Sequence, residues 1–307
     1  MSNGEYKVRV LNLRGSLGLF FRDRVALVAA IVIVAFAVLG IFARFLAPYP
    51  AQGAGAPHLA TVLQPPSLKH LFGTDQYGRD ILSRVLFGIR TSLFEGVAVV
   101  GIGLVIGVPL GIIAGYYGGA IDETIMRITD IFLAFPYLLL ALIIVATLGP
   151  GLLNVIIALS VTWWPWYVRI ARGQTVSLKN RPFVLVARSF GIKSTRILLR
   201  HIFPNSMSPV IIQATLDFGG VILSAAGLSF LGLGVQEPLA DLGLMIGEGQ
   251  SYMLYYWWVA TFPGIALFII AIAFNLLGDS LRDYLDPRYQ KRRLLIPYIR
   301  GGNLDEA

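Results

Sequence analysis

The sequence contains no cysteine and few charges. Without cysteine the chain holds no disulfide, iron–sulfur cluster or Cys-based zinc site. Charged residues make up 14% of its 307 residues, against about 25% in an ordinary soluble domain. Hydrophobic residues make up 56%, which excludes intrinsic disorder because disordered chains are poor in apolar residues. Most of the chain is therefore predicted to lie in a lipid bilayer.

Sequence motifs for several kinds of active site are also missing. The three histidines are far apart in the sequence and none lies in an HExxH motif, so no metal site is predicted. Residues 191–195 resemble a phosphate-binding loop, but Ile192 stands where that motif needs glycine. No soluble basic module is present that would connect the net charge of +8 with nucleic acid. We predict a chain that is not an enzyme and binds no cofactor.

Uncharged stretches indicate the membrane spans, because a helix needs about 20 apolar residues to cross a hydrocarbon core of about 30 Å. These stretches are residues 25–43, 96–121, 131–168 and 249–278. The third is long enough for two spans, and residues 148–151 (Leu-Gly-Pro-Gly) predict a tight hairpin between them. Residues 202–236 contain only one acid, Asp217, and their span is expected to begin near Ser208. The fold class predicted is an all-α membrane protein with six transmembrane helices.

Basic residues predict the orientation, because cytoplasmic segments of membrane proteins are rich in Lys and Arg. Five lie before the first span, eight lie in residues 169–200 without any acid, and six lie in residues 282–300. The connection between the last two spans has none. Six spans place the three basic segments on one side, so both termini are predicted to be cytoplasmic.

This topology divides the chain into consecutive parts. They are a cytoplasmic N-terminal segment (1–24), a first span (25–47), an extracytoplasmic loop with an elbow helix (48–91), a five-helix core (92–278) and a cytoplasmic tail (279–307). The core includes a basic cytoplasmic loop, residues 169–207.

The basic loop is predicted to form two short amphipathic helices. Pro182 suits the first turn of a helix over residues 182–190, and Gly191 suits its end. Ser194 is a candidate cap for a second helix, which Pro204 is expected to stop. Two such helices either occupy a groove of another protein or lie on lipid headgroups, and the pattern leaves both readings open.

Four glycines are spaced four residues apart in the second span, which gives that helix a face of small residues. They are Gly103, Gly107, Gly111 and Gly115. We expect this face to pack closely against another helix, either of this subunit or of a partner.

Asp217 is the one acid inside a predicted span, and Gln213 lies one turn earlier on the same face. A charge at this depth is costly and usually faces protein or a wet cavity. Asp217 therefore either lines a translocation path or makes a structural hydrogen bond to a neighbouring helix. The aromatic residues at 163–167 are expected at the membrane interface.

Residues 183–205 resemble the EAA loop of permease subunits in binding-protein-dependent ABC importers. That pattern is E-A-A-x-x-x-G followed by a hydrophobic stretch and a proline. Leu185 stands in place of its Glu, and Val186 in place of an Ala. The resemblance implies that the loop couples the permease to an ATPase. The coupling residues implied are Ala187, Arg188, Ser189, Phe190, Gly191, Ile192, Lys193, Ser194 and Pro204.

A second motif narrows the family. Residues 72–84 are similar to the signature F-G-T-D-x-x-G-R-D-x-x-S-R of the dipeptide, oligopeptide and nickel branch. Residues 22–27, 47–50 and 278–287 look like the C-type subunit of oligopeptide permeases. The signature residues are Gly73, Thr74, Asp75, Gly78, Arg79, Asp80, Ser83 and Arg84. Their chemistry fits a structural elbow with local ion pairs, or a contact with substrate or a docking protein.

The resemblance covers about residues 20–288 and implies a type I ABC importer permease in the cell membrane. In that family, two homologous permeases enclose the pathway, two ATPases hydrolyse ATP below them, and an extracytoplasmic binding protein delivers the substrate. Substrates of this branch are peptides, nickel or oligosaccharides. The alternative is a secondary transporter or channel acting alone, which predicts internal repeats and several ionisable groups at mid-membrane.

Overall fold

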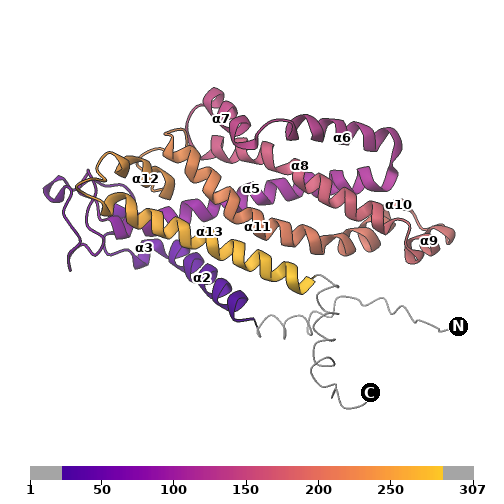
Figure 1. Cartoon of the computed structure of the whole chain (residues 1–307), viewed down its shortest axis with the longest axis horizontal. Coiled ribbons are helices and arrows are strands. Elements are labelled where there is room, and N and C mark those ends of the chain that lie inside the picture. Colours follow the sequence, from indigo (N-terminus) through magenta and orange to yellow (C-terminus); the bar gives the residue numbers. More distant parts are fainter. Residues whose placement is uncertain (1–22, 286–307) are drawn as a thin grey trace, which may run out of the picture.

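The computed structural model describes residues 23–285, which form a bundle of long helices (Figure 1). The long helices are α2 (Arg24–Ile41), α5 (Ile81–Tyr117), α8 (Leu152–Leu178), α11 (Phe203–Phe230) and α13 (Trp258–Leu285). Those of intermediate length are α6 (Gly119–Leu133) and α7 (Tyr137–Leu148). The short ones are α3 (Ala43–Leu46), α4 (Pro50–Gly53), η1 (Leu59–Thr61), α9 (Pro182–Ser189), α10 (Ser194–Ile197) and α12 (Leu242–Gln250). Within residues 23–285 the only β pairing is an isolated bridge between Thr74 and Asp80.

Helix α5 is the centre of the bundle. It packs along α8 and also contacts α2, α11 and α13, while α11 lies against both α8 and α13. Helix α12 lies at one end of the bundle, and α9 and α10 lie at the other (Figure 1).

Four described helices are long and apolar enough to cross a membrane: α2, α5, the run Ser194–Phe230 and α13. Helices α6 and α7 pass the same test only as a pair, bent by 83° at the break between them. The predicted hairpin is confirmed, because α7 ends at Leu148 and α8 begins at Leu152. Gly149 and Gly151 in this turn have φ angles of 90° and 150°, a region that favours glycine. An all-helical membrane protein is thus confirmed.

The elbow helix predicted within residues 48–91 and the predicted second span form one continuous helix, α5. Its first residue is Ile81, because the Asp80 carboxylate caps the helix by accepting a hydrogen bond from the Ser83 amide at 2.8 Å. Residues 81–91, expected in an extracytoplasmic loop, therefore belong to the same 37-residue helix as the second span.

Helical structure extends into the predicted loop over residues 169–207. Helix α8 continues to Leu178, so residues 169–178 are helical. Two arginines in this stretch bind acids of α6: Arg169 pairs with Asp130, and Arg172 pairs with Asp122. These pairs hold the end of α8 against α6. Most of the predicted N-terminal segment (1–24) and of the predicted tail (279–307) lies outside the described residues, and residues 279–285 belong to α13.

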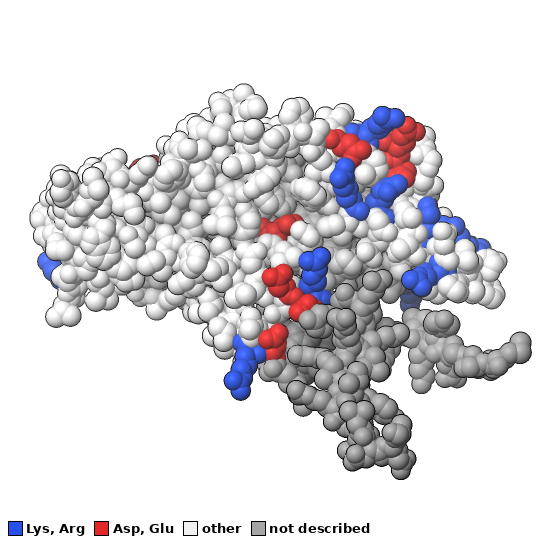
Figure 2. Space-filling view, in the orientation of Figure 1, with Lys and Arg blue, Asp and Glu red and all other residues white. Residues whose placement is uncertain are grey.

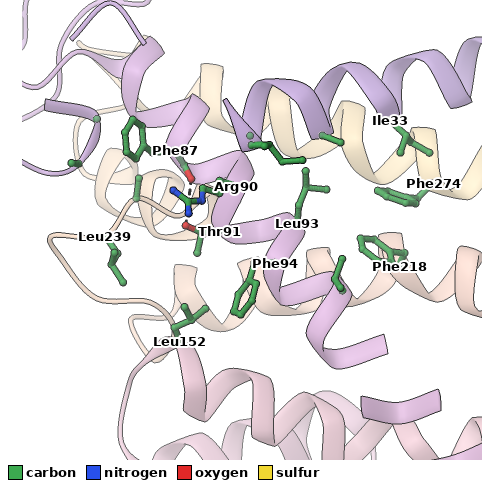
Figure 3. Close-up of a pocket in the computed structure, with 17 residues that line it drawn as sticks. Ile33, Phe87, Arg90, Thr91, Leu93, Phe94, Leu152, Phe218, Leu239 and Phe274 are labelled. Carbon is green, nitrogen blue, oxygen red and sulfur yellow. Dashed lines mark hydrogen bonds between the residues drawn. The ribbon is translucent and has the colours of Figure 1, made fainter. Parts of the chain in front are cut away.

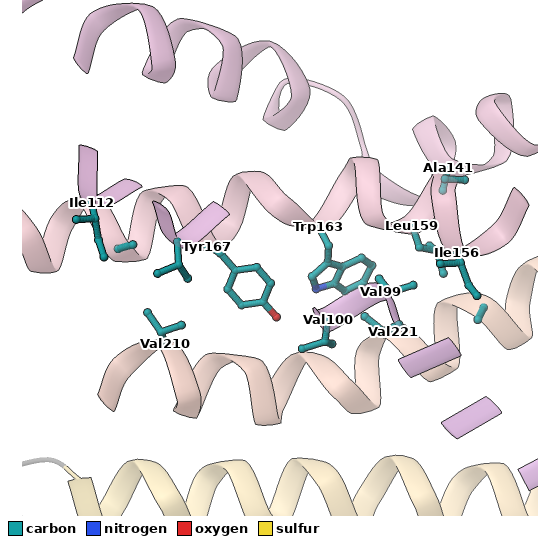
Figure 4. Close-up of a cluster of buried hydrophobic side chains, with 14 of the residues drawn as sticks. Val99, Val100, Ile112, Ala141, Ile156, Leu159, Trp163, Tyr167, Val210 and Val221 are labelled. Atoms are coloured by element: carbon teal, nitrogen blue, oxygen red, sulfur yellow. The ribbon is translucent and has the colours of Figure 1, made fainter. Parts of the chain in front are cut away.

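The four glycines of α5 face α8. A Cβ atom added to Gly107 would lie 2.5 Å from the Trp164 carbonyl oxygen, and one on Gly115 would lie 2.8 Å from the Arg172 carbonyl oxygen. Gly111 meets the α8 backbone at the Val168 carbonyl oxygen, and Gly103 meets the ring of Tyr167. A cluster of buried side chains continues this seam, including Val100 and Ile112 of α5 (Figure 4). The small-residue face therefore packs against a helix of the same chain.

We expect Gly107→Ala to destabilise the protein, because the added methyl group forces α5 away from the α8 backbone. Overpacking of this kind costs about 1–3 kcal/mol, and the thermal unfolding midpoint in detergent should fall by several degrees. Gly101→Ala is the matched control, since a Cβ there meets nothing within 4 Å. An equal drop in both variants would contradict the packing role.

Candidate functional site

The segment between α8 and α11 begins with α9, where Pro182 occupies the first turn as predicted. Gly191 follows α9 with a φ of 69°. Its amide donates to the Arg188 carbonyl, and the Ile192 amide donates to the Ala187 carbonyl. This is the Schellman arrangement, which satisfies the last carbonyls of a helix. A Cβ at Gly191 would meet nothing within 4 Å, so only the backbone conformation calls for glycine.

The second predicted helix begins and ends differently from the prediction. Ser194 is the first residue of α10 and makes no capping hydrogen bond. Pro204 does not stop the helix: the chain passes through a π-helical turn, Leu198–Ile202, directly into α11. The π-helical turn ahead of Pro204 is wider than a regular helical turn. It therefore accommodates the proline ring, which would clash with the preceding turn of a regular helix. The Asn205 side chain also donates to the His201 carbonyl at 2.6 Å.

This segment buries one set of apolar residues and exposes another. Val184 and Ile202 are fully buried, whereas Phe190 is 80% exposed and Leu199 is 72% exposed. Leu185, at the position of the family's Glu, is also exposed. Lys and Arg gather at this end of the molecule (Figure 2). The exposed surface combines apolar and basic side chains.

Three contacts fasten the segment to the last turn of α5. The Arg188 guanidinium lies 4.7 Å from the centre of the Tyr116 ring, a cation–π distance. The Tyr116 hydroxyl lies 3.3 Å from the Ser194 hydroxyl oxygen. Lys179 donates to the Gly115 carbonyl at 2.8 Å. A displacement of α9 therefore acts on α5.

The predicted extracytoplasmic loop of residues 48–91 is called loop 1 below. Its signature residues lie at the other end of α5 and are buried. Two of them are turn glycines: Gly73 and Gly78 have φ angles of 77° and 73°. Asp80 caps α5 and accepts a 3.0 Å hydrogen bond from His70, whose second ring nitrogen has no partner in the described part of the chain. The Thr74 hydroxyl donates to the Thr61 carbonyl. These contacts fix a tight elbow ahead of the helix.

The charged signature residues form a network that is only partly local. Arg79 binds Asp75 at 2.6 Å, as the local reading predicts. However, Arg79 also binds Glu237 at 2.6 Å, and Arg84 binds Glu237 at 2.9 Å instead of a neighbour in loop 1. Arg84 has no exposed surface. The network thus joins the start of α5 to the connection between α11 and α12.

A second carboxylate stands beside this network. Glu248 lies 3.7 Å from Arg79 and accepts a 2.8 Å hydrogen bond from Gln76. Burial, and then the charge of Glu237, raise the pKa of Glu248 to about 7. Burial disfavours the charge of Glu237 as well, but the hydrogen bond from Arg79 and the charges of both arginines hold its pKa below the ordinary value. Near neutral pH, Glu237 is ionised and Glu248 is partly protonated.

The sequence reading missed Glu237 because it lies 158 positions from Arg79. The available signal was the charge of its connection, which is acidic while loop 1 has a basic excess. Glu95 was missed for another reason: it borders an uncharged stretch and so looked like a loop residue. In the structure it is a fully buried residue of α5.

Asp217 and Gln213 share a face of α11, as predicted, and Gln213 donates to one Asp217 oxygen at 2.8 Å. The other Asp217 oxygen is buried without a hydrogen-bond partner in residues 23–285. The same holds for the hydroxyl of Tyr167, which points from α8 toward α11 (Figure 4). Trp163 and Tyr167 are buried in the middle of α8, so the interfacial prediction for them is wrong. No group of metal-binding side chains occurs in the described residues.

Two family models match this sequence. Residues 107–291 match one described as binding-protein-dependent transport system inner membrane component. Residues 16–66 match the N-terminal TM domain of oligopeptide transport permease C.

Individual proteins are similar over most of their length. A dipeptide transport system permease protein of Alkalihalophilus pseudofirmus is 43% identical over 87% of this chain and 87% of its own. A glutathione transport system permease protein of Escherichia coli is 47% identical over 88% of each chain. A structure of the MetNI methionine ABC transporter shares the fold, with a TM-score of 0.54 and 20% identity over 67% of this chain and 98% of that one.

The raised pKa of Glu248 makes stability depend on pH. The folded protein holds this proton more tightly than the unfolded chain does, so the contribution of Glu248 to stability is greatest below the ordinary Glu pKa of about 4.5. It should fall as the pH rises from about 5 through 7, because Glu248 then ionises beside Glu237. Unfolding midpoints measured across this range should fall less steeply in Glu248→Gln. Glu123→Gln, which changes an exposed pair with Arg127, should retain the wild-type slope. Identical slopes in all three proteins would contradict this assignment.

Proposed function

Because the chain belongs to the family of binding-protein-dependent transport system inner membrane components and is a membrane-spanning permease subunit of an ABC importer, we propose that it carries short peptides. Relatives named for dipeptide and glutathione transport support this substrate class. The family implies ATPase and binding-protein partners and a membrane. We further propose that a homologous but different permease completes the pathway and that two partner ATPases hydrolyse the ATP.

The proposed topology has six spans with both termini in the cytoplasm. Five of them are the helices that pass the length and hydropathy test, α2, α5, the bent pair α6–α7, α11 and α13. The sixth is α8, which packs along α5 over its length and follows α7 after the hairpin. The end of the bundle with α9 and α10 then faces the cytoplasm, in agreement with the Lys and Arg residues gathered there (Figure 2). Loop 1 and α12 face outward. The core of residues 92–278 and the loop of residues 169–207 keep their roles, with helix boundaries as described above.

The fastening of α9 to α5 is the observation that carries the coupling mechanism. The ATPase contacts the segment around Gly191, from Ala187 to Ser194, and the apolar side chains exposed there form this contact. Since Leu185 replaces the family's Glu, the contact is apolar at that position. When ATP draws the ATPases together, α9 moves and Arg188 transmits the movement to Tyr116 at the end of α5. Helix α5 then alternates between two positions, and the energy comes from the ATPases.

The loop 1 signature serves as an elbow in this mechanism. Arg79 binds Asp75, Arg84 binds Glu237, and the Asp80 carboxylate caps α5. Because these charged side chains are buried and already paired, they are unavailable to a substrate. The elbow anchors the outer end of α5 while its inner end follows α9.

Asp217 is proposed to line the pathway. One oxygen of Asp217 on α11 and the hydroxyl of Tyr167 on α8 have no hydrogen-bond partner in residues 23–285, and both are proposed to bind the ammonium group of a peptide. A purely structural carboxylate would have both oxygens satisfied. A secondary transporter acting alone is disfavoured, because the family and the named relatives are importer permeases.

Gly191→Val tests the coupling role. Valine at a φ of 69° is strained by about 1–2 kcal/mol, but it meets no neighbouring atom, so α9 should be distorted while the bundle stays folded. In proteoliposomes containing the full importer, dipeptide uptake per ATP hydrolysed should fall severalfold. Gly191→Asn is the matched control, because asparagine tolerates this conformation and should retain coupling.

The ATPases should co-purify with the tagged chain in mild detergent, which checks that the Gly191 variants still assemble. Normal uptake and normal substrate-stimulated ATP hydrolysis in Gly191→Val would overturn the coupling role. Purification of this chain as a self-sufficient homo-oligomer would overturn the importer assembly itself.

Asp217→Asn should lower dipeptide uptake about tenfold while leaving assembly intact. The substitution removes the charge that pairs with an ammonium group, and a hydrogen bond to a charged group is worth about 1.5–3 kcal/mol. Asp130→Asn removes an equal charge from an exposed pair with Arg169 and should leave uptake unchanged. If Asp217→Asn assembles and transports like the wild type, the pathway role is lost.

A further inference from the structure

A cavity of about 800 Å³ lies between α2, α5, α11 and α13 (Figure 3). Its wall is apolar, with Ile33 of α2, Leu93 and Phe94 of α5, and the stacked rings of Phe218 and Phe274. Arg90 and Thr91 supply the only polar side chains of the lining. The Thr91 hydroxyl already donates to the Phe87 carbonyl, which leaves the Arg90 guanidinium as the one available donor among them.

Arg90 lies at the level of one end of α2. A Cβ atom added to Gly40 would lie 3.2 Å from the Arg90 Cα, and α2 ends one residue later, at Ile41. The 18 residues of α2 span about 27 Å, close to the thickness of a hydrocarbon core of about 30 Å. Arg90 is therefore at headgroup depth on the side of loop 1, and Ile33 and Phe274 lie deeper in the hydrocarbon.

The charge of Arg90 is uncompensated in the part of the chain that the structure describes. Arg79 and Arg84, on the same side of the molecule, are buried in ion pairs. Arg90 is exposed and forms no ion pair with any acid of residues 23–285. An anionic group is the chemistry that complements it, and an apolar chain is the chemistry that complements the wall below it.

We propose that this cavity binds one glycerophospholipid from the leaflet on the loop 1 side. The phosphate binds the Arg90 guanidinium, and an acyl chain occupies the apolar space between α2 and α5. A peptide substrate fits poorly, because its amides and charged ends would lose water without gaining partners. A bound lipid would join α2, which buries few of its own residues, to α5 and α13. This site goes beyond the proposed transport function and does not depend on which substrate is carried.

Native mass spectrometry of the assembled importer tests the site, with phosphatidylglycerol as the probe lipid. The wild type should retain one tightly bound lipid, and Arg90→Gln should weaken its apparent affinity about fivefold, which corresponds to about 1 kcal/mol for one basic residue. Arg44→Gln is the matched control, since Arg44 is an exposed arginine just beyond α2 that does not line the cavity. It should bind the lipid like the wild type.

Two alanines of α2 test the acyl-chain part of the site. Ala37 lines the cavity, so Ala37→Phe should fill it and abolish retention without changing any charge. Ala35 is exposed and does not line the cavity, so Ala35→Phe should have no effect. Equal effects of Arg90→Gln and Arg44→Gln would reduce the finding to general annular lipid and overturn the proposal. So would retention in Ala37→Phe, or a cavity that is covered by the partner permease and retains no lipid.

Discussion

The buried arginine Arg84 determines how one end of the central helix α5 is held. Arg84 has no exposed surface, and removing a guanidinium from water costs several kcal/mol that only pairing and hydrogen bonds recover. Glu237 supplies the paired charge, and the Pro238 carbonyl accepts a further hydrogen bond at 2.7 Å. Because these partners come from the connection between α11 and α12, α5 cannot take its place until that distant connection is folded against it. The pair thus fixes one end of the central helix.

Along its length, α5 is held by a different interaction, which is close packing against α8. Helices in lipid gain little from burying apolar surface against one another, since lipid tails are equally apolar, and close packing has to replace that gain. Gly107, Gly111 and Gly115 allow close contact with the α8 backbone, and the hydrogen bond from Lys179 to the Gly115 carbonyl lies at the end of this seam. Helix α5 is therefore held at one end by ion pairs and at the other by α8 and by the contacts of α9. In the coupling mechanism that we propose, this helix carries the displacement of α9 to the far end of the bundle.

The features that could be read from the sequence are those set by local composition. The turn around Gly149 and the end of α9 at Gly191 follow from backbone freedom, and the uncharged stretches follow from the cost of charge in lipid. The features missed depend on partners far away in the chain. Glu95 becomes buried, and Glu237 gains its arginine partners, only when α5 meets the segment near α12. Pro204 was expected to end a helix because a single sequence does not reveal that a π-helical turn ahead of it would absorb the proline.

The scarcity of charge that marks this sequence makes each remaining charge interpretable. Asp75, Arg79 and Arg84 are compensated inside the chain, and they hold the elbow in place. Asp217 is satisfied at one oxygen and open at the other, and Arg90 has no acidic partner among residues 23–285. The open oxygen of Asp217 is buried, so a charge there is costly unless something outside the described chain complements it. The compensated charges thus belong to the architecture, and the open ones are the groups that we propose bind substrate and lipid.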